Sequence, residues 1–154
     1  MFIKLRRLLR LGRREEGAAA VEFALCLIPL LLLVGGIIDF GHLWYMESVV
    51  ATASREGARY AARYTTDASG DHRLTPSGLS PSVVNDITDN YGRLLPSDAD
   101  FSVTPGGAGF TSTTAGLPVS IQVTAQKHWF LLSHLIPVIT DPQTLRSTTV
   151  MSLE

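Results

Sequence analysis

Glu22 has the clearest capacity for chemistry in this chain, because it is the only charged side chain in a long apolar run. The run covers residues 18–38, AAAVEFALCLIPLLLLVGGII, and Gly17 stands directly before it. A carboxylate near the centre of a membrane span is unfavourable by about 2.5–3.5 kcal/mol, so it persists only with a partner or a function. Alternatively, Glu22 lies shallow, extends to the cytoplasmic interface and complements the positive end of the helix. The spacing alone does not decide between these two interpretations.

Residues 18–38 have the length and composition of a single membrane-spanning helix. At about 1.5 Å per residue the run reaches about 31 Å, close to the hydrocarbon thickness of a bilayer. It is longer than the apolar region of a cleaved secretory signal and lacks a small-x-small cleavage site at its end, so we expect it to be retained. The basic residues before it are Lys4, Arg6, Arg7, Arg10, Arg13 and Arg14. Their position predicts a cytoplasmic N-terminus rather than a nucleic-acid partner, with residues 39–154 on the other side of the membrane.

A helix is predicted to continue past the span over residues 39–64, which contain no proline and many helix-forming residues. Small or apolar side chains recur on one face of it: Val50, Ser54, Gly57, Ala58, Ala61 and Ala62. Such a face lets another backbone approach closely. We expect that backbone to be the protein's own sheet, although another arc of the helix can also contact a second subunit. Trp44, Tyr45 and Met46 are expected in the interfacial belt just outside the span.

The rest of the chain predicts a short helix and a small antiparallel sheet. The strongest pattern is the alternation of apolar and polar residues over 118–127, which is typical of a half-buried strand. The full set of expected elements is a loop at 65–80, a helix at 82–95 and strands at about 100–104, 118–127 and 144–153. The apolar, helix-like stretch Trp129–Ile139 is too short to span a membrane, and we expect it under the sheet or near the membrane surface. The predicted fold class is α+β, with one long N-terminal helix packed on the sheet.

The residues around Gly17 resemble the cleavage site of a type IV prepilin, in which a basic tail and a glycine precede an apolar helix that opens with Glu22 and Phe23. The resemblance implies that a prepilin peptidase removes residues 1–17 by cutting before Ala18. Glycine suits such a site because a residue without a side chain lets the backbone extend into a protease active site. The cut leaves a positive α-ammonium group on Ala18. Glu22 would neutralise that group on a neighbouring subunit and so set the register of helix on helix.

A longer segment, residues 17–63, is similar to the TadE-like family of the tight-adherence (Tad, or Flp) pilus system. Besides the cleavage motif, the matching features are Pro29 followed by leucines, the pair Asp39 and Gly41, and the sequence ASREGARYAA at 53–62. A weaker similarity lies in the last two predicted strands. The resemblance implies a pilin-like fold and a pseudopilin or minor pilin that takes part in pilus assembly, and through it in adhesion and biofilm formation. The size of the C-terminal domain argues against the very short major pilin of this system.

The same resemblance implies where the protein acts and what it contacts. The expected location is the bacterial inner membrane, crossed once with the C-terminal domain in the periplasm, before any incorporation into a pilus. The implied partners are the prepilin peptidase, other Tad pilins and minor pilins, the inner-membrane pilus platform and the lipid bilayer.

The sequence offers little basis for enzymatic chemistry. It contains no GxSxG, P-loop or Rossmann motif, and its four histidines have no metal-ligand spacing. We therefore expect no catalytic residue, no metal and no cofactor. The alternative to a pilus subunit is a single-span, membrane-anchored periplasmic scaffold or binding protein that does not enter a filament. The predicted cleavage site at Gly17 and the acidic residue Glu22 distinguish the two functions, because a tether requires neither of them.

Overall fold

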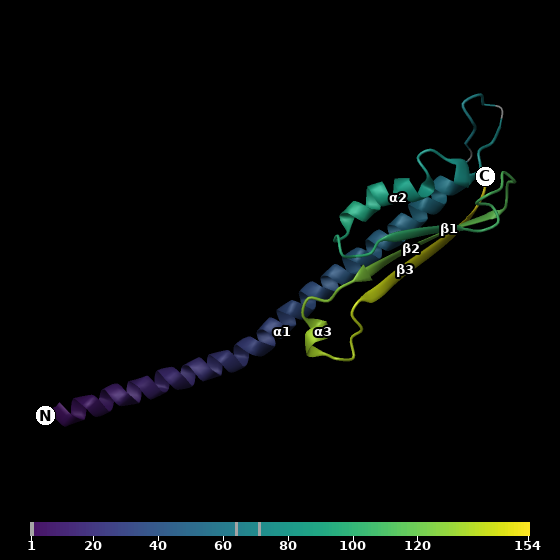
Figure 1. The fold of residues 1–154 in the computed structure, drawn as a ribbon. Helices are drawn as coiled ribbons and strands as arrows, with labels where there is room; N and C mark the ends of the chain where they lie inside the picture. Colours follow the sequence, from purple (N-terminus) through teal and green to yellow (C-terminus); the bar gives the residue numbers. More distant parts are fainter. Residues whose placement is uncertain (1, 64, 71) are drawn as a thin grey trace.

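The computed structural model describes the backbone of residues 2–63, 65–70 and 72–154, and the side chains of the same residues except 2–16 and 135. One helix, α1 (Phe2–Ala62), projects beyond all other elements, which gather around its C-terminal half (Figure 1). The basic side chains of the predicted leader lie outside the described side chains. Residue 64, the predicted end of the helix after the span, also lies outside the described residues.

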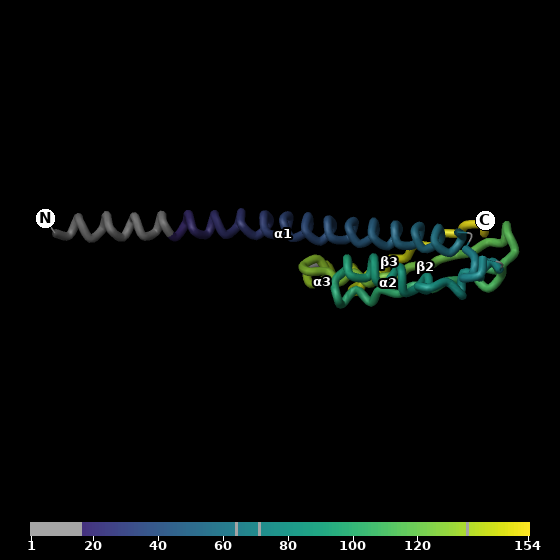
Figure 2. Tube along the Cα trace, turned by 90° about the horizontal axis from the view of Figure 1, so that it is seen from above, coloured from purple at the N-terminus to yellow at the C-terminus, as the bar shows by residue number. Residues whose placement is uncertain are grey.

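The sheet has three antiparallel strands in the order β1-β2-β3, with β1 at Ser102–Gly106, β2 at Pro118–Lys127 and β3 at Gln143–Ser152. The central strand pairs with β3 along its whole length, from Pro118 opposite Ser152 to Lys127 opposite Gln143. The sheet packs on α1, whose first half stays clear of it (Figure 2). The predicted α+β fold, a long helix on a small antiparallel sheet, is confirmed.

The alternation of residues along β2 sets which face of the sheet is buried. Val119, Ile121, Val123 and Ala125 are all 0% exposed and belong to the core formed with α1 and α2. The intervening polar residues are half-buried on the opposite face. Burial of apolar surface is the main favourable contribution to folding, so this inward row fixes the strand against the helix. Lys127, at the end of β2, falls on the same inward row.

The small side chains of α1 pack against the protein's own domain. Ala53, Ser54 and Ala58 are 0% exposed, and the Ser54 hydroxyl lies 2.9 Å from the hydroxyls of both Ser147 and Thr149 on β3. At Gly57 a Cβ atom would overlap Cδ1 of Ile87 on the neighbouring helix. The predicted packing of this face on the protein's own sheet is confirmed, and the second helix uses the same face.

That second helix, α2 (Val83–Tyr91), packs on α1 next to the sheet. It begins at Ser82, whose hydroxyl accepts a hydrogen bond from the backbone N–H of Asn85 at 3.2 Å. A serine in this position satisfies one of the backbone donors left free at the start of a helix. Short 3-10 turns flank the helix at Pro76–Gly78 (η1) and Gly92–Leu94 (η2).

Of the three residues expected in the interfacial belt, Trp44 and Tyr45 are exposed and Met46 is not. Trp44 is 70% exposed, and Tyr45 is half-exposed with its hydroxyl donating to the carbonyl of Leu94 at 3.0 Å. Met46 is 1% exposed and lies in the core. Its predicted place in the belt is wrong because it lies seven residues before Ala53 and four before Val50, on the helix face that meets the sheet.

The apolar stretch Trp129–Ile139 contains only one turn of helix, α3 (Leu132–Leu135). Both views place α3 beyond the end of the sheet, as the domain element nearest the projecting half of α1 (Figures 1 and 2). A Cβ atom at Gly35 would overlap Cδ2 of Leu131, so this stretch packs on the last turns of the predicted span. The expectation that it lies under the sheet is therefore wrong, and the expectation of a place near the membrane surface stays a prediction.

Candidate functional site

The part of the projecting helix whose side chains are described is apolar and bare. From residue 17 to residue 34 every side chain is exposed except that of Leu27, which is partly buried. Within the described part of the chain, α1 is the helix that is long and apolar enough to cross a membrane. An exposed apolar stripe of this length marks a surface that is covered by lipid or by another protein.

The four residues predicted from the cleavage motif lie on this bare helix. Gly17, Ala18, Glu22 and Phe23 are all exposed and span only about 9 Å of helix. The described side chains include none that forms a hydrogen bond or an ion pair with Glu22. No atom lies within 4 Å of a Cβ built on Gly17. The fold therefore presents these residues to other molecules and does not join them to its own domain.

The junction between the projecting helix and the domain contains a buried ion pair. Asp39 lies on α1 one residue past the predicted span, and Lys127 is the last residue of β2. Each side chain is 1% exposed, and Lys127 Nζ lies 3.4 Å from Asp39 Oδ1. Removing one partner of such a buried pair is strongly destabilising, because the other charge is left alone out of water.

The Asp39 carboxylate also accepts three backbone N–H groups at the start of α3. Its Oδ1 accepts from Phe130 at 2.8 Å, and its Oδ2 accepts from Leu131 at 2.9 Å and from Leu132 at 3.1 Å. Burial raises the pKa of Asp39, but the three backbone donors and the Lys127 ammonium together lower it by more, so the pKa lies below its ordinary value. The carboxylate is thus held in its charged form by the segment that it anchors.

Lys127 has two further partners for its positive charge. Its ammonium group donates to the carbonyl of His128 and lies 5.1 Å from the centre of the Trp129 ring. A desolvated cation over an aromatic face gains electrostatic energy from the ring. The carboxylate, the carbonyl and the ring together replace the water that Lys127 loses on burial.

The segment that connects β2 to β3, residues 128–142, is called here the Trp129 loop. Its base is closed by the Trp129 indole, which donates to the carbonyl of Thr140 at 3.0 Å, and by the Asp141 carboxylate, which accepts from the Ser133 hydroxyl at 3.2 Å. Trp129 also packs edge-on against Phe40 of α1, with ring centres 6.0 Å apart. The loop is therefore folded on itself and docked on the helix.

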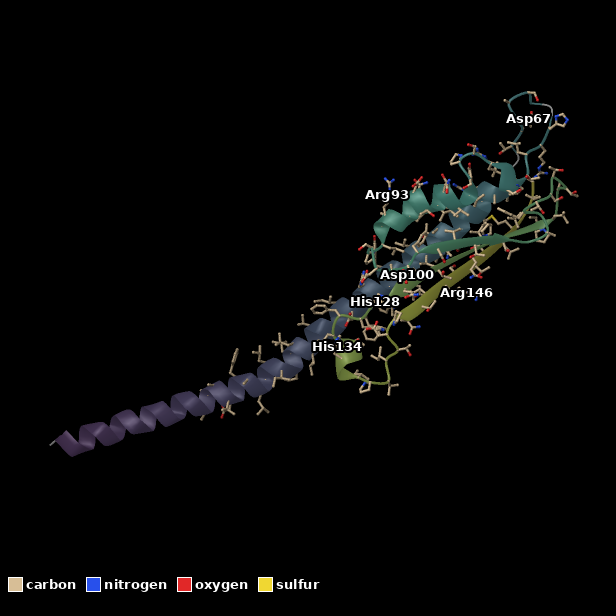
Figure 3. All side chains as sticks on the ribbon, viewed as in Figure 1. Asp67, Arg93, Asp100, His128, His134 and Arg146 are labelled. Atoms are coloured by element: carbon tan, nitrogen blue, oxygen red, sulfur yellow. The ribbon has the colours of Figure 1, made fainter. Side chains whose placement is uncertain are left out.

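The two histidines of this region sit on opposite parts of the loop, His128 at its start and His134 on α3 (Figure 3). His128 Nδ1 lies 3.4 Å from Asp141 Oδ1, and both side chains are partly exposed. Beside them, a hollow of about 380 Å³ opens between α1 and the loop, with Met46, His42, Pro96 and Asp98 among its lining residues. In the described part of the chain, no three acidic, cysteine or histidine side chains are placed to hold a metal ion.

The family model described as TadE-like protein matches residues 17–59. These residues are TadE-like. The match indicates a Tad pilus-associated protein that associates with other pilus components, and the apolar helix fits a membrane anchor in such a protein. No curated protein and no solved structure matches the chain.

The TadE-like segment contains one half of the junction and not the other. It begins at Gly17 and includes Glu22, Phe23 and Asp39, whereas Lys127 lies in the part of the chain that the family model does not cover. Asp39 was noted in the sequence only as a matching feature, and Lys127 was not singled out. The sequence pattern did place both residues at positions that face the core. Asp39 lies seven positions, or about two helical turns, before the core residue Met46. Lys127 continues the alternation of buried residues along β2.

Acid is expected to weaken the contacts that Asp39 of the TadE-like segment makes with Lys127 and the Trp129 loop. Because the pKa of Asp39 is lower in the folded protein than its ordinary value, the unfolded chain takes up the proton first as the pH falls. The contribution of Asp39 to stability is therefore complete above about pH 5 and is lost progressively below about pH 4. Thermal unfolding of the detergent-solubilised protein, followed by near-UV circular dichroism across this range, measures the loss. The Asp39→Asn variant should lose less stability on acidification, and an identical loss in both proteins would contradict this role of Asp39.

Proposed function

We propose that this protein is a pseudopilin or minor pilin that takes part in the assembly of the Tad pilus through its N-terminal helix. The observation that carries the proposal is the bare apolar stretch of α1 at residues 17–34, which contains one acidic side chain, Glu22, and lies in a TadE-like segment that begins at Gly17. A filament subunit needs such a surface because its helix packs on the helices of other subunits.

In the proposed mechanism the prepilin peptidase cuts between Gly17 and Ala18. Gly17 favours the cut because glycine destabilises a helix by about 0.5–1 kcal/mol relative to alanine and so lets the backbone extend locally. The new ammonium group of Ala18 then pairs with Glu22 of a neighbouring subunit. In the low dielectric of the membrane this pair is stronger than it would be in water, so it defines the axial position of one helix on the next.

The proposed topology follows from charge. The basic residues before Gly17 keep the N-terminus in the cytoplasm, where the peptidase acts, and the domain lies in the periplasm. From the inner membrane the processed protein contacts other Tad pilins and the pilus platform. Phe23, 67% exposed on the projecting helix, supplies apolar surface next to the ion pair.

Mass spectrometry of the protein extracted from piliated cells tests the proposal. The expected first residue is Ala18, because cleavage removes residues 1–17. Cells that lack the prepilin peptidase are the control and should contain the uncleaved chain. An intact N-terminus in piliated cells with an active peptidase would instead favour the single-span periplasmic scaffold, in which the helix is only a tether.

A further inference from the structure

The Trp129 loop carries apolar side chains that the domain does not cover. Phe130 is 76% exposed, Val138 is 90% exposed and Ile136 is 45% exposed. All three lie in the segment that connects β2 to β3, at the end of the domain nearest the projecting helix (Figure 1). Water is an unfavourable environment for a cluster of this kind.

Two contacts fix the level of this loop along α1. Leu131 packs on Gly35, and the backbone N–H groups of Phe130, Leu131 and Leu132 bind the carboxylate of Asp39. Gly35 lies three residues inside the end of the predicted span, or about 4.5 Å along the helix. When residues 18–38 cross the bilayer, the loop is therefore level with the outer part of the hydrocarbon layer.

We propose that the Trp129 loop enters the bilayer beside the span, with Phe130, Ile136 and Val138 among the lipid acyl chains of the periplasmic leaflet. The proposal rests on the membrane span of the proposed function and adds a second membrane contact to it. The domain is then held to the lipid surface at two places, by α1 and by a loop more than eighty residues further along the chain.

The polar groups of the loop suit this environment. A backbone segment at membrane depth must satisfy its hydrogen bonds within the protein. Besides the three N–H groups bound by Asp39, those of His134, Ile136 and Ile139 donate to carbonyls of the same loop at 2.9–3.2 Å. The charges of Asp39 and Lys127 neutralise each other and are shielded from the surroundings.

Entry is shallow, because the loop also carries exposed polar groups. His134 and Asp141 are exposed on it and remain at the level of the lipid headgroups. The exposed Trp44 and half-exposed Tyr45 of α1 lie just past Asp39 and mark the same interface, where aromatic residues are enriched. The loop and these aromatic side chains thus define one membrane-facing end of the domain.

Fluorescence quenching by lipids tests the proposal on the full chain. In a Cys26→Ala background, an environment-sensitive dye is attached to Val138→Cys, and the protein is reconstituted into phosphatidylcholine and phosphatidylglycerol vesicles with a nitroxide on the acyl chain. The matched control is Val150→Cys, since Val150 is also an exposed valine (61%) but lies on β3 near the membrane-distal end. The expected result is severalfold stronger quenching at position 138 than at position 150, and stronger quenching by a nitroxide near the headgroup than by one near the chain end.

The native Cys26, which is exposed on α1, separates this proposal from the one on which it rests. If dye on Cys26 of the otherwise unchanged protein is quenched but dye at position 138 is quenched no more than at position 150, the loop lies outside the lipid and the inference is wrong while the span stands. If a second copy of the protein covers the loop, quenching at position 138 is absent at a high ratio of protein to lipid and appears only after dilution with lipid. That result also overturns the inference. If Cys26 itself is not quenched, the span fails and with it the proposed function.

Discussion

Replacing Glu22 with glutamine is expected to abolish pilus formation while processing continues. Glutamine is nearly the same size as glutamate but cannot neutralise the Ala18 ammonium of a neighbouring subunit. A charge left unpaired in an apolar environment costs about 3–5 kcal/mol, and about 1.4 kcal/mol already changes an equilibrium tenfold. We therefore expect at least about a tenfold drop in pili per cell, counted by electron microscopy, with the processed form still detected by mass spectrometry.

Glu47→Gln is the matched control for this experiment. Glu47 is also an exposed glutamate of α1, but it lies past the span and beside the domain. The same loss of charge there should leave piliation unchanged. If the Glu22→Gln cells are normally piliated, Glu22 has no part in assembly, and the shallow position in which it only complements the helix end becomes the better interpretation.

Replacing Lys127 with methionine is expected to destabilise the domain by about 3–5 kcal/mol, because it leaves the buried Asp39 carboxylate without its counter-charge. Methionine retains most of the apolar stem of lysine, so the change reports mainly on the ammonium group. The expected fall in the unfolding temperature is about 10 °C or more, measured by circular dichroism on the detergent-solubilised full chain.

Two further variants show whether the loss comes from the buried pair. Arg93→Met removes a cation whose partner Asp89 lies at 3.7 Å in an exposed ion pair, and it should cost less than about 1 kcal/mol. The double variant Asp39→Asn with Lys127→Met should lose less than the sum of the single variants, because neither charge is then left alone. Strict additivity would show that the two side chains stabilise the protein independently.

The parts of the structure that local pattern decides were predictable from the sequence. The alternation over residues 118–127 predicted β2, and the apolar run predicted the helix that is long and apolar enough to cross a membrane. The strand predicted at about 100–104 instead continues through Pro105 to Gly106. It can do so because β1 is an edge strand, where a proline costs no hydrogen bond to a further neighbour.

The junction was not predictable in the same way, because its two charged residues lie 88 positions apart. The periodicity of the sequence places each of them on the buried face of its element. However, a charged residue at such a position is normally interpreted as the end of the helix or strand, unless its partner is known. The Trp129 loop was ambiguous for a related reason. Its apolar residues looked helix-like but form only one turn of helix. The contacts of Leu131 and Asp39 with the rest of the protein are what place it.

The continuity of α1 through the junction has a geometric consequence. Each residue of an α-helix turns the chain by about 100°, and no break separates Gly17 from Ala62. In the proposed filament, the direction in which the domain points from the axis of α1 is therefore fixed by the number of residues between Glu22 and Asp39. A single inserted alanine in that interval would swing the domain about a quarter of a revolution relative to the register set by the ion pair, while the composition of the helix stayed almost the same.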